Sequence, residues 1–128
     1  MKLQTTTPVF LVSDVGATIR WYESTLGFEG DPFPPNPPYV FGILRRDDVE
    51  IMLQRLEGYE KPDLYAQRAG GVWDVYVRCE GVRELYDDVV KRGEVTVLRP
   101  LCPQPYGQLE FEIRDPNGYV LVFAERTA

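Results

Sequence analysis

Two hydrophobic periodicities alternate along the chain, and the same succession of them occurs twice. In the first half, an apolar run at residues 8–13 predicts a strand, and residues 15–26 carry apolar side chains at helical spacing. Asp14 is the expected N-cap of this helix and Gly27 the glycine that ends it. Extended segments follow at 28–33, 39–45 and 49–55, and a tight turn at 46–48 joins the last two.

The second half repeats this order. The pattern predicts a strand at 71–78, an amphipathic helix at 82–91 closed by Gly93, and an extended segment at 94–98. Two further strands are expected at 109–113 and 119–125, joined by the turn sequence Asp-Pro-Asn-Gly at 115–118.

Landmarks in the two halves align with an offset of roughly 64 to 70 residues. We therefore expect an α+β fold of two βαβββ modules in tandem, forming a pseudo-symmetric, mostly antiparallel curved sheet with outer helices. The modules span about residues 8–55 and 71–126 of one domain that covers 1–128, with a linker at 56–70. The prolines between positions 32 and 38 predict a stiff loop, because proline cannot extend a helix or pair in a central strand.

Histidine is absent from the 128 residues. This removes the most frequent general base and the most frequent transition-metal ligand, so any catalytic triad that needs histidine is excluded. The formal net charge of −6 argues against nucleic-acid binding, which requires a basic surface. No apolar run approaches the ~20 residues of a membrane-spanning helix, so no membrane association is expected.

The two cysteines, Cys79 and Cys102, do not form a CxxC or another metal-binding spacing. The first seven residues do not have the character of a secretory signal peptide. We therefore expect a cytoplasmic protein with two reduced thiols.

Several of these segments resemble the vicinal oxygen chelate superfamily, which includes glyoxalase I, extradiol dioxygenases, fosfomycin-modifying enzymes and bleomycin-resistance proteins. In the first half the resemblance is carried by Val-Ser-Asp-Val-Gly-Ala at 12–17, Trp21-Tyr22 and Leu-Gly-Phe at 26–28. In the second half it is carried by Arg-Asp-Pro-Asn-Gly-Tyr at 114–119, and the likeness covers about residues 8–126.

Within that superfamily the chain most resembles the bleomycin-resistance proteins. The similar segments are Pro8-Val9 ahead of Asp14-Val15, and the stretches 46–49, 84–86, 104–107 and 111–125. The resemblance implies a metal-free protein that sequesters an antibiotic or a similar ligand, and a homodimer whose chains form the pockets between them. The density of prolines at 34–38 and a tyrosine at position 106, in place of a tryptophan-type residue, depart from that pattern.

The enzymes of the superfamily hold a divalent metal with histidine and glutamate side chains on the inner faces of their sheets. Counting from the shared motifs places the four positions at Thr7, Met52, Asp74 and Val122. Of these only Asp74 suits a hard divalent ion, so the resemblance implies no metal and no cofactor. Nearby acids could supply oxygens to a different site, but their strand positions favour ordinary solvent-facing side chains; they are Glu50, Glu110, Glu112 and Glu125.

A cleft without metal can still bind a small molecule through apolar and aromatic side chains. The expected ligand-binding residues are Phe41, Met52 and Gln54 in the first module and Asp74, Tyr76 and Tyr106 in the second. Phe41 and Tyr106 fall on positions that carry groove-lining aromatics in the bleomycin-resistance proteins, while core packing stays open for Phe41 and Tyr76. Trp73 alternates with Asp74 along the strand, which predicts that it packs under the helix.

The function expected from these observations is binding of a small, aromatic or cationic molecule, without catalysis. The alternative is a glyoxalase-superfamily enzyme of the lyase, isomerase or dioxygenase type with a non-standard or absent metal site. In such an enzyme a carboxylate such as Asp74 or Glu110 would work with a tyrosine in acid–base chemistry. A regulatory module that binds a protein partner is a third class, for which the sequence offers no separate motif.

Overall fold

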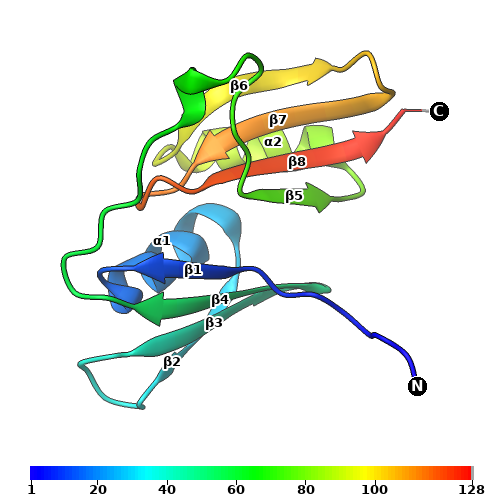
Figure 1. The fold of residues 1–128 in the computed structure, drawn as a ribbon. Coiled ribbons are helices and arrows are strands. Elements are labelled where there is room, and N and C mark those ends of the chain that lie inside the picture. Colours follow the sequence, from blue (N-terminus) through cyan, green and yellow to red (C-terminus); the bar gives the residue numbers. More distant parts are fainter. Residues whose placement is uncertain (128) are drawn as a thin grey trace. The chain divides into compact units, whose positions relative to one another are not determined.

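The computed structural model describes residues 1–127, and the chain divides into two compact units, Met1–Glu60 and Lys61–Ala128. Each unit contains one βαβββ module, as the blue-to-green and green-to-red halves of the ribbon show (Figure 1). The two sheets have the same strand order, β1-β4-β3-β2 in the first unit and β5-β8-β7-β6 in the second. The predicted α+β class and the tandem modules are therefore confirmed, with the strands of residues 1–127 divided between two four-stranded sheets.

The first unit follows the predicted order closely. Its elements are β1 (Val9–Val12), α1 (Val15–Leu26), β2 (Glu29–Phe33), β3 (Phe41–Arg46) and β4 (Val49–Arg55). Strand β1 pairs parallel to β4, and the other neighbours are antiparallel. Pro32, the first of the prolines that predict a loop, lies inside β2, where it is tolerated because β2 is an edge strand.

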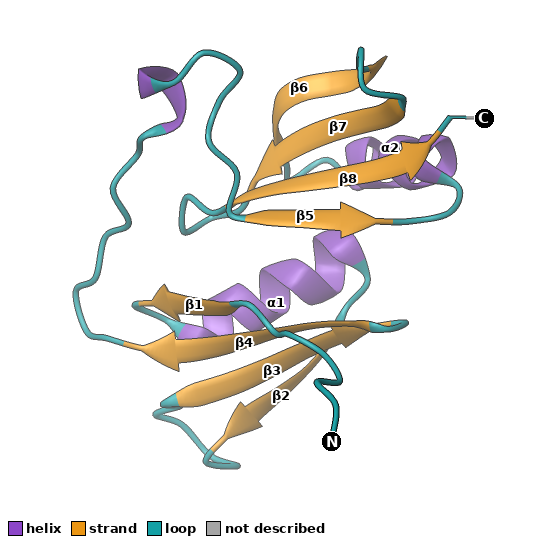
Figure 2. Cartoon of the chain, turned by 45° about the vertical axis from the view of Figure 1, so that its right-hand side comes forward, coloured by secondary structure: helices purple, strands orange, loops and turns teal. Residues whose placement is uncertain are grey.

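Helix α1 begins and ends at the predicted residues for local reasons. The Asp14 carboxylate accepts a hydrogen bond from the Ala17 backbone N–H at 2.9 Å, and Gly27 takes the left-handed conformation with φ 67°. The helix covers one face of its sheet (Figure 2), where the fully buried side chains Tyr22, Leu44 and Ile51 form the core. A Cβ at Gly30 would overlap the side chain of Ile19, so glycine permits this close approach of helix and strand.

The second unit adds a short 3-10 helix before its module. Its elements are η1 (Tyr65–Gln67), β5 (Val75–Arg78), α2 (Val82–Arg92), β6 (Thr96–Pro103), β7 (Gln108–Arg114) and β8 (Val120–Arg126). Strand β5 pairs parallel to β8, and β7 is antiparallel to both β8 and β6, with two register irregularities in the β6–β7 pairing. The predicted strand at 71–78 is thus wrong in its first four residues, since the strand starts at Val75.

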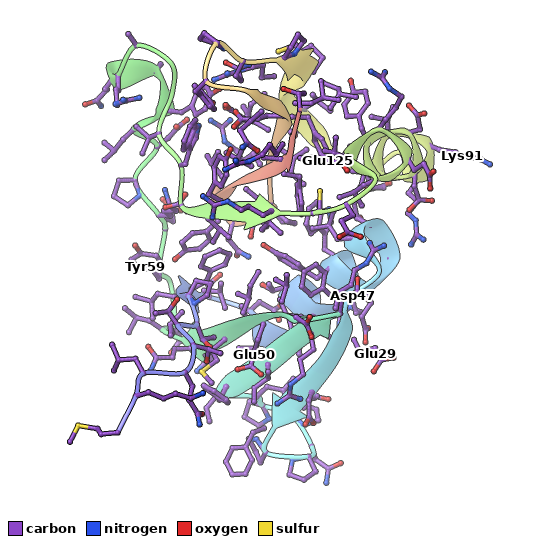
Figure 3. The ribbon with its side chains drawn as sticks, turned by 90° about the vertical axis from the view of Figure 1, so that its right-hand side faces the viewer. Glu29, Asp47, Glu50, Tyr59, Lys91 and Glu125 are labelled. Carbon is purple, nitrogen blue, oxygen red and sulfur yellow. The ribbon has the colours of Figure 1, made fainter. Side chains whose placement is uncertain are left out.

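Helix α2 lacks a side-chain cap of its own, because Gly81 occupies the N-cap position. The carboxylate of Glu125, from the end of β8, accepts hydrogen bonds from the backbone N–H groups of Gly81 and Val82 at 3.1 and 3.0 Å. Figure 3 shows Glu125 beside the start of this helix. Phe111 and Phe123 stack at 5.2 Å between ring centroids on the face of the sheet that α2 covers. Within residues 1–127, no α-helix covers the opposite face of either sheet.

No helix in residues 1–127 is both long and apolar enough to span a membrane.

Candidate functional site

Strand β7 presents two fully buried glutamates on the face of its sheet that α2 does not cover, which we call the open face. Side chains alternate along a strand, so Phe111 and Ile113 point toward α2, while Glu110 and Glu112 point away from it. Both carboxylates have an exposed fraction of 0%. Burying an unpaired carboxylate costs free energy, so the groups that pair with Glu110 and Glu112 define the site.

The Glu110 carboxylate accepts hydrogen bonds from two phenols. One comes from Tyr76 on β5 and the other from Tyr106, in the turn before β7, at 2.6 Å. Burial, followed by the hydrogen bond to Glu110, raises the pKa of Tyr76 to about 12, and the same causes raise the pKa of Tyr106. Both phenols therefore stay protonated near neutral pH and act as donors to the carboxylate.

The Glu112 carboxylate is held by three groups. It forms an ion pair with the Arg99 guanidinium on β6 at 2.5 Å and accepts hydrogen bonds from the Tyr65 hydroxyl at 2.5 Å and the Trp73 indole N–H at 3.1 Å. Burial, with the adjacent Glu112 as the next cause, raises the pKa of Tyr65. Both oxygens of Glu112 are thus engaged.

Two of these partners belong to residues 61–73, which we call the strap. The strap crosses the open face in front of β7 and β8, with α2 on the far side of the sheet (Figure 1). It is fastened by ion pairs between Asp63 and Arg114 at 3.3 Å and between Lys61 and Asp74, also at 3.3 Å. A Cβ at Gly71, which has φ 83°, would overlap the Tyr65 ring, so the strap turns closely around this tyrosine.

The four positions at which the superfamily's enzymes hold a metal do not suit a divalent ion in this chain. In the second unit, Val122 carries no donor atom, and one oxygen of Asp74 already accepts the Val120 backbone N–H at 2.9 Å and faces Lys61. In the first unit, Thr7 and Met52 offer a hydroxyl and a thioether, which are weak partners for hard ions. Among residues 1–127, no three His, Cys, Asp or Glu side chains are grouped so that they could hold a metal ion.

Of the predicted ligand-binding residues, all but Asp74 lie on the open faces of the two sheets or reach them, as Tyr106 does through its hydroxyl. In the first unit, Phe41 on β3 is the register partner of Gln54 on β4, and Met52 is paired with Ile43, while the alternating residues such as Leu53 are buried toward α1. In the second unit, Tyr76 lies on the open face beside Glu110, whereas Asp74 precedes β5 and one of its carboxylate oxygens accepts the Val120 backbone N–H. Their roles in binding remain predictions.

Two expectations about this face are wrong. Trp73 does not pack under the helix, because its indole N–H reaches Glu112 on the open face, where its ring lies 5.4 Å from that of Tyr76. Glu110 and Glu112 are not solvent-facing strand residues, because phenols, an indole and a guanidinium cover them. Glu50 in the first unit does fit the expectation better, since its carboxylate, labelled on β4 in Figure 3, pairs with the half-exposed Arg45.

The sequence reasoning missed Arg99, Tyr65 and the burial of the two glutamates. One signal was available: Glu110 and Glu112 alternate with Leu109, Phe111 and Ile113, which places both carboxylates on one face of a strand. Nothing local indicates that residues from β6 and the strap cover them.

The chain belongs to the Glyoxalase/Bleomycin resistance protein/Dioxygenase superfamily, whose family model matches residues 4–123. Among characterised proteins, it is 29% identical over 124 residues to a lactoylglutathione lyase from Haemophilus influenzae, covering 89% of this chain and 86% of that one.

Two solved structures illustrate the shared fold. A glyoxalase-related enzyme from Clostridium phytofermentans has a TM-score of 0.77 and 20% identity, with 98% of this chain and 97% of that chain covered. The bleomycin-binding protein from bleomycin-producing Streptomyces verticillus, complexed with copper(II)-bleomycin, has a TM-score of 0.68 and 23% identity, with 100% and 98% covered.

Proposed function

We propose that this chain is a metal-independent small-molecule-binding protein that sequesters an antibiotic or a similar aromatic ligand, with the open face of the second sheet as its principal site. The observation that carries the proposal is the way the aromatic side chains of this face are fastened. Tyr106 and Trp73 are 53% and 40% exposed, yet their polar atoms are bonded to buried glutamates.

Rings held in this way form a pre-ordered platform. A ligand that stacks on them does not have to freeze freely rotating side chains, and this lowers the entropic cost of binding. Aromatic rings also attract cationic groups through their π faces, so an aromatic or cationic ligand fits the platform.

The same contacts argue against acid–base catalysis by these groups. The raised pKa of Tyr76 makes its phenol a poor base at neutral pH, and both carboxylates already accept hydrogen bonds from neighbouring side chains. Asp74, the other candidate base, is tied to Lys61 and to the Val120 backbone N–H.

The open face of the first unit carries the other residues that we propose as ligand-binding. Phe41, Met52 and Gln54 lie on neighbouring strands there, and they offer apolar surface with one amide for orientation. We also propose that the protein is cytoplasmic and forms a homodimer, because pairing of two chains would cover the exposed strand edges of the sheets. Sedimentation equilibrium at micromolar concentration would give the mass of two chains, and the mass of a single chain would disprove the homodimer.

The test of binding is a calorimetric titration of metal-free bleomycin into protein first assayed for bound metal. We expect saturable binding near one ligand per chain, weakened at least about ten-fold by Tyr106→Ala. Phe33→Ala is the matched control, because Phe33 is 60% exposed on the edge strand of the other sheet. If bleomycin and other planar cationic ligands give no heat, or if both variants bind as the unchanged protein does, the proposal fails.

A lyase activity is the second candidate, and the characterised relative from Haemophilus influenzae favours it. Its test is an assay of lactoylglutathione turnover with and without added divalent metal. Turnover that depends on metal would replace the binding proposal with a catalytic one.

A further inference from the structure

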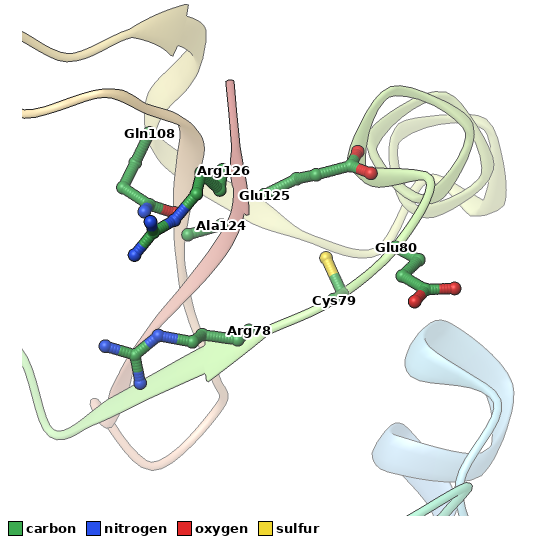
Figure 4. Close-up of a pocket in the computed structure, with 7 residues that line it drawn as sticks. All are labelled: Arg78, Cys79, Glu80, Gln108, Ala124, Glu125 and Arg126. Atoms are coloured by element: carbon green, nitrogen blue, oxygen red, sulfur yellow. The ribbon is translucent and has the colours of Figure 1, made fainter. Parts of the chain in front are cut away.

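The second unit has a pocket at the end of its sheet and a strap across its open face, and only the strap points to a class of ligand. Figure 4 shows the pocket, where the guanidinium groups of Arg78 and Arg126 are matched by the carboxylates of Glu80 and Glu125. These balanced charges favour no ligand. The strap, in contrast, places a phenol of the protein itself on a buried acceptor.

The strap is attached to the sheet through side chains, and within residues 1–127 no backbone-to-backbone hydrogen bond joins the two. Its own backbone bonds are internal, from the Gln67 N–H to the Leu64 carbonyl and from the Gly71 N–H to the Arg68 carbonyl. Most strap residues are exposed. Detaching the strap therefore breaks side-chain contacts and unpairs no strand, which is typical of a segment that opens locally.

Tyr65 is the strap residue that lies in a phenol-binding position. Its hydroxyl donates to the Glu112 carboxylate at 2.5 Å, the Arg114 guanidinium lies 5.9 Å from its ring centroid, and a Cβ at Gly71 would overlap its ring. Glu112 has an exposed fraction of 0%, so its carboxylate needs a donor here whether or not Tyr65 supplies it. Trp73 of the aromatic platform donates to the same carboxylate, so this position adjoins the platform.

We infer that Tyr65 is an intramolecular competitor, and that a ligand carrying a phenol binds the open face by displacing it. The ligand hydroxyl replaces the Tyr65 hydroxyl as the donor to Glu112, so the buried carboxylate keeps its hydrogen bonds. A side chain on a short tether has an effective concentration in the millimolar range, so the strap weakens the binding of any phenol that makes no other contact. The inference deepens the proposed function and rests on it in one respect, that the open face is the binding face.

The test is a calorimetric titration with p-cresol, which is the tyrosine side chain as a free molecule. Its comparison ligand is p-cresyl methyl ether, which has the same ring but no hydrogen to donate. We expect Tyr65→Ala to bind p-cresol at least about ten-fold more tightly than the unchanged protein, because the competitor is gone. In this variant the methyl ether should bind at least about ten-fold more weakly than p-cresol, because it gives Glu112 no donor.

Two further variants complete the titration. Tyr65→Phe keeps the ring and removes only the donor, so it should bind p-cresol several-fold more tightly than the unchanged protein, and it decides the question if Tyr65→Ala does not fold. Tyr39→Ala is the matched control, because Tyr39 is half-buried in the first unit and none of the hydrogen bonds in residues 1–127 engages its hydroxyl. It should leave p-cresol binding as it is in the unchanged protein.

Displacement of the strap is measured by hydrogen exchange of the Gln67 and Gly71 amides, whose bonds lie within the strap. In the unchanged protein p-cresol should speed their exchange, and the methyl ether should not. The inference is overturned if the Tyr65 variants bind p-cresol no more tightly than the unchanged protein, if the two ligands bind alike, or if p-cresol does not speed this exchange. Bleomycin binding is read through Tyr106, so a p-cresol failure leaves the proposed function standing and a bleomycin failure leaves the phenol result standing.

Discussion

The two sheets of this molecule have the same strand order, but the Arg–Glu ion pairs on their open faces differ in burial. On the first, Arg45 and Glu50 form an ion pair at 2.9 Å with side chains 54% and 31% exposed. On the second, Arg99 and Glu112 pair at 2.5 Å with side chains 24% and 0% exposed. The two modules therefore carry one solvent-exposed ion pair and one ion pair whose carboxylate is buried.

The difference comes from what covers each face. In the second unit the strap lies over β7, and its Tyr65 and Trp73 complete the hydrogen bonds of Glu112. In the first unit, Glu50 has only Arg45 and a long contact of 3.5 Å from the Thr7 hydroxyl. A buried carboxylate is stable only where several donors surround it, so aromatic rings held by buried carboxylates occur on one face and not on the other.

The largest expected change in stability comes from removing the arginine of each ion pair. Arg99→Met leaves a buried carboxylate without its counter-ion, and we expect a loss of about 3 kcal/mol in the free energy of unfolding. Arg45→Met should cost less than about 1 kcal/mol, because an exposed ion pair is screened by water. Urea unfolding of the two variants measures both values.

A second substitution shows whether the lost charge pairing is the cause. Glu112→Gln in the Arg99→Met background keeps an acceptor for Tyr65 and Trp73 but removes the unpaired charge, so it should restore much of the stability. Equal losses for Arg99→Met and Arg45→Met would mean that burial does not distinguish the two faces.

The next effect concerns the phenols. Tyr76→Phe removes a donor from the buried Glu110, and we expect a loss of about 1 to 2 kcal/mol. Tyr39→Phe, in the first unit, should be close to neutral, because none of the hydrogen bonds in residues 1–127 engages its hydroxyl. If thermal unfolding shows the same small change for both, Tyr76 is not needed to satisfy Glu110.

The same phenol predicts a pH dependence at the alkaline side. The pKa of Tyr76 is raised from 10.0 to about 12 in the folded chain, so between these values the unfolded state loses its proton first. Stability from this group is complete below pH 10 and falls as the pH rises toward 12. Unfolding titrations should show a shallower alkaline decline for Tyr76→Phe than for the unchanged protein, and parallel declines would contradict this assignment.

Local signals in the sequence predicted the helices well and the strap poorly. The ends of α1 are fixed by Asp14 and Gly27, which act within one turn of the helix, so the predicted and observed bounds coincide. Residues 71–74 alternate like a strand, but Gly71 has φ 83° and Asp74 turns its carboxylate to the Val120 N–H. The conformation of Gly71 depends on Tyr65, and the orientation of the Asp74 carboxylate depends on β8. The pattern of residues 71–74 alone does not indicate either contact.

The candidate site was predictable only in part for the same reason. Alternation along β7 gives the shared face of Glu110 and Glu112. Burial of the glutamates depends on residues 34 to 47 positions away, such as Tyr65 and Tyr76. The β6–β7 register, which is irregular on both sides of Arg99, also brings that arginine to Glu112. Burial by residues from distant parts of the chain cannot be predicted from periodicity or spacing.

The smallest expected effect compares how the two helices begin. Asp14 caps α1 from within the chain segment that starts the helix, whereas Glu125 caps α2 from 43 residues away on β8. Asp14→Ala should cost about 1 kcal/mol, and Glu125→Gln should lower the thermal midpoint by less, because the amide still accepts one N–H.

The two backbone hydrogen bonds, first that from Val82, lower the pKa of Glu125 from its ordinary 4.5. Its stabilising effect is thus present above pH 4.5 and is lost as the pH falls through the lower value in the folded chain. Thermal unfolding between neutral and acid pH should therefore show the gap between the unchanged protein and Glu125→Gln closing at acid pH. If the difference in thermal midpoint stays constant with pH, the charge of Glu125 does not stabilise the start of α2.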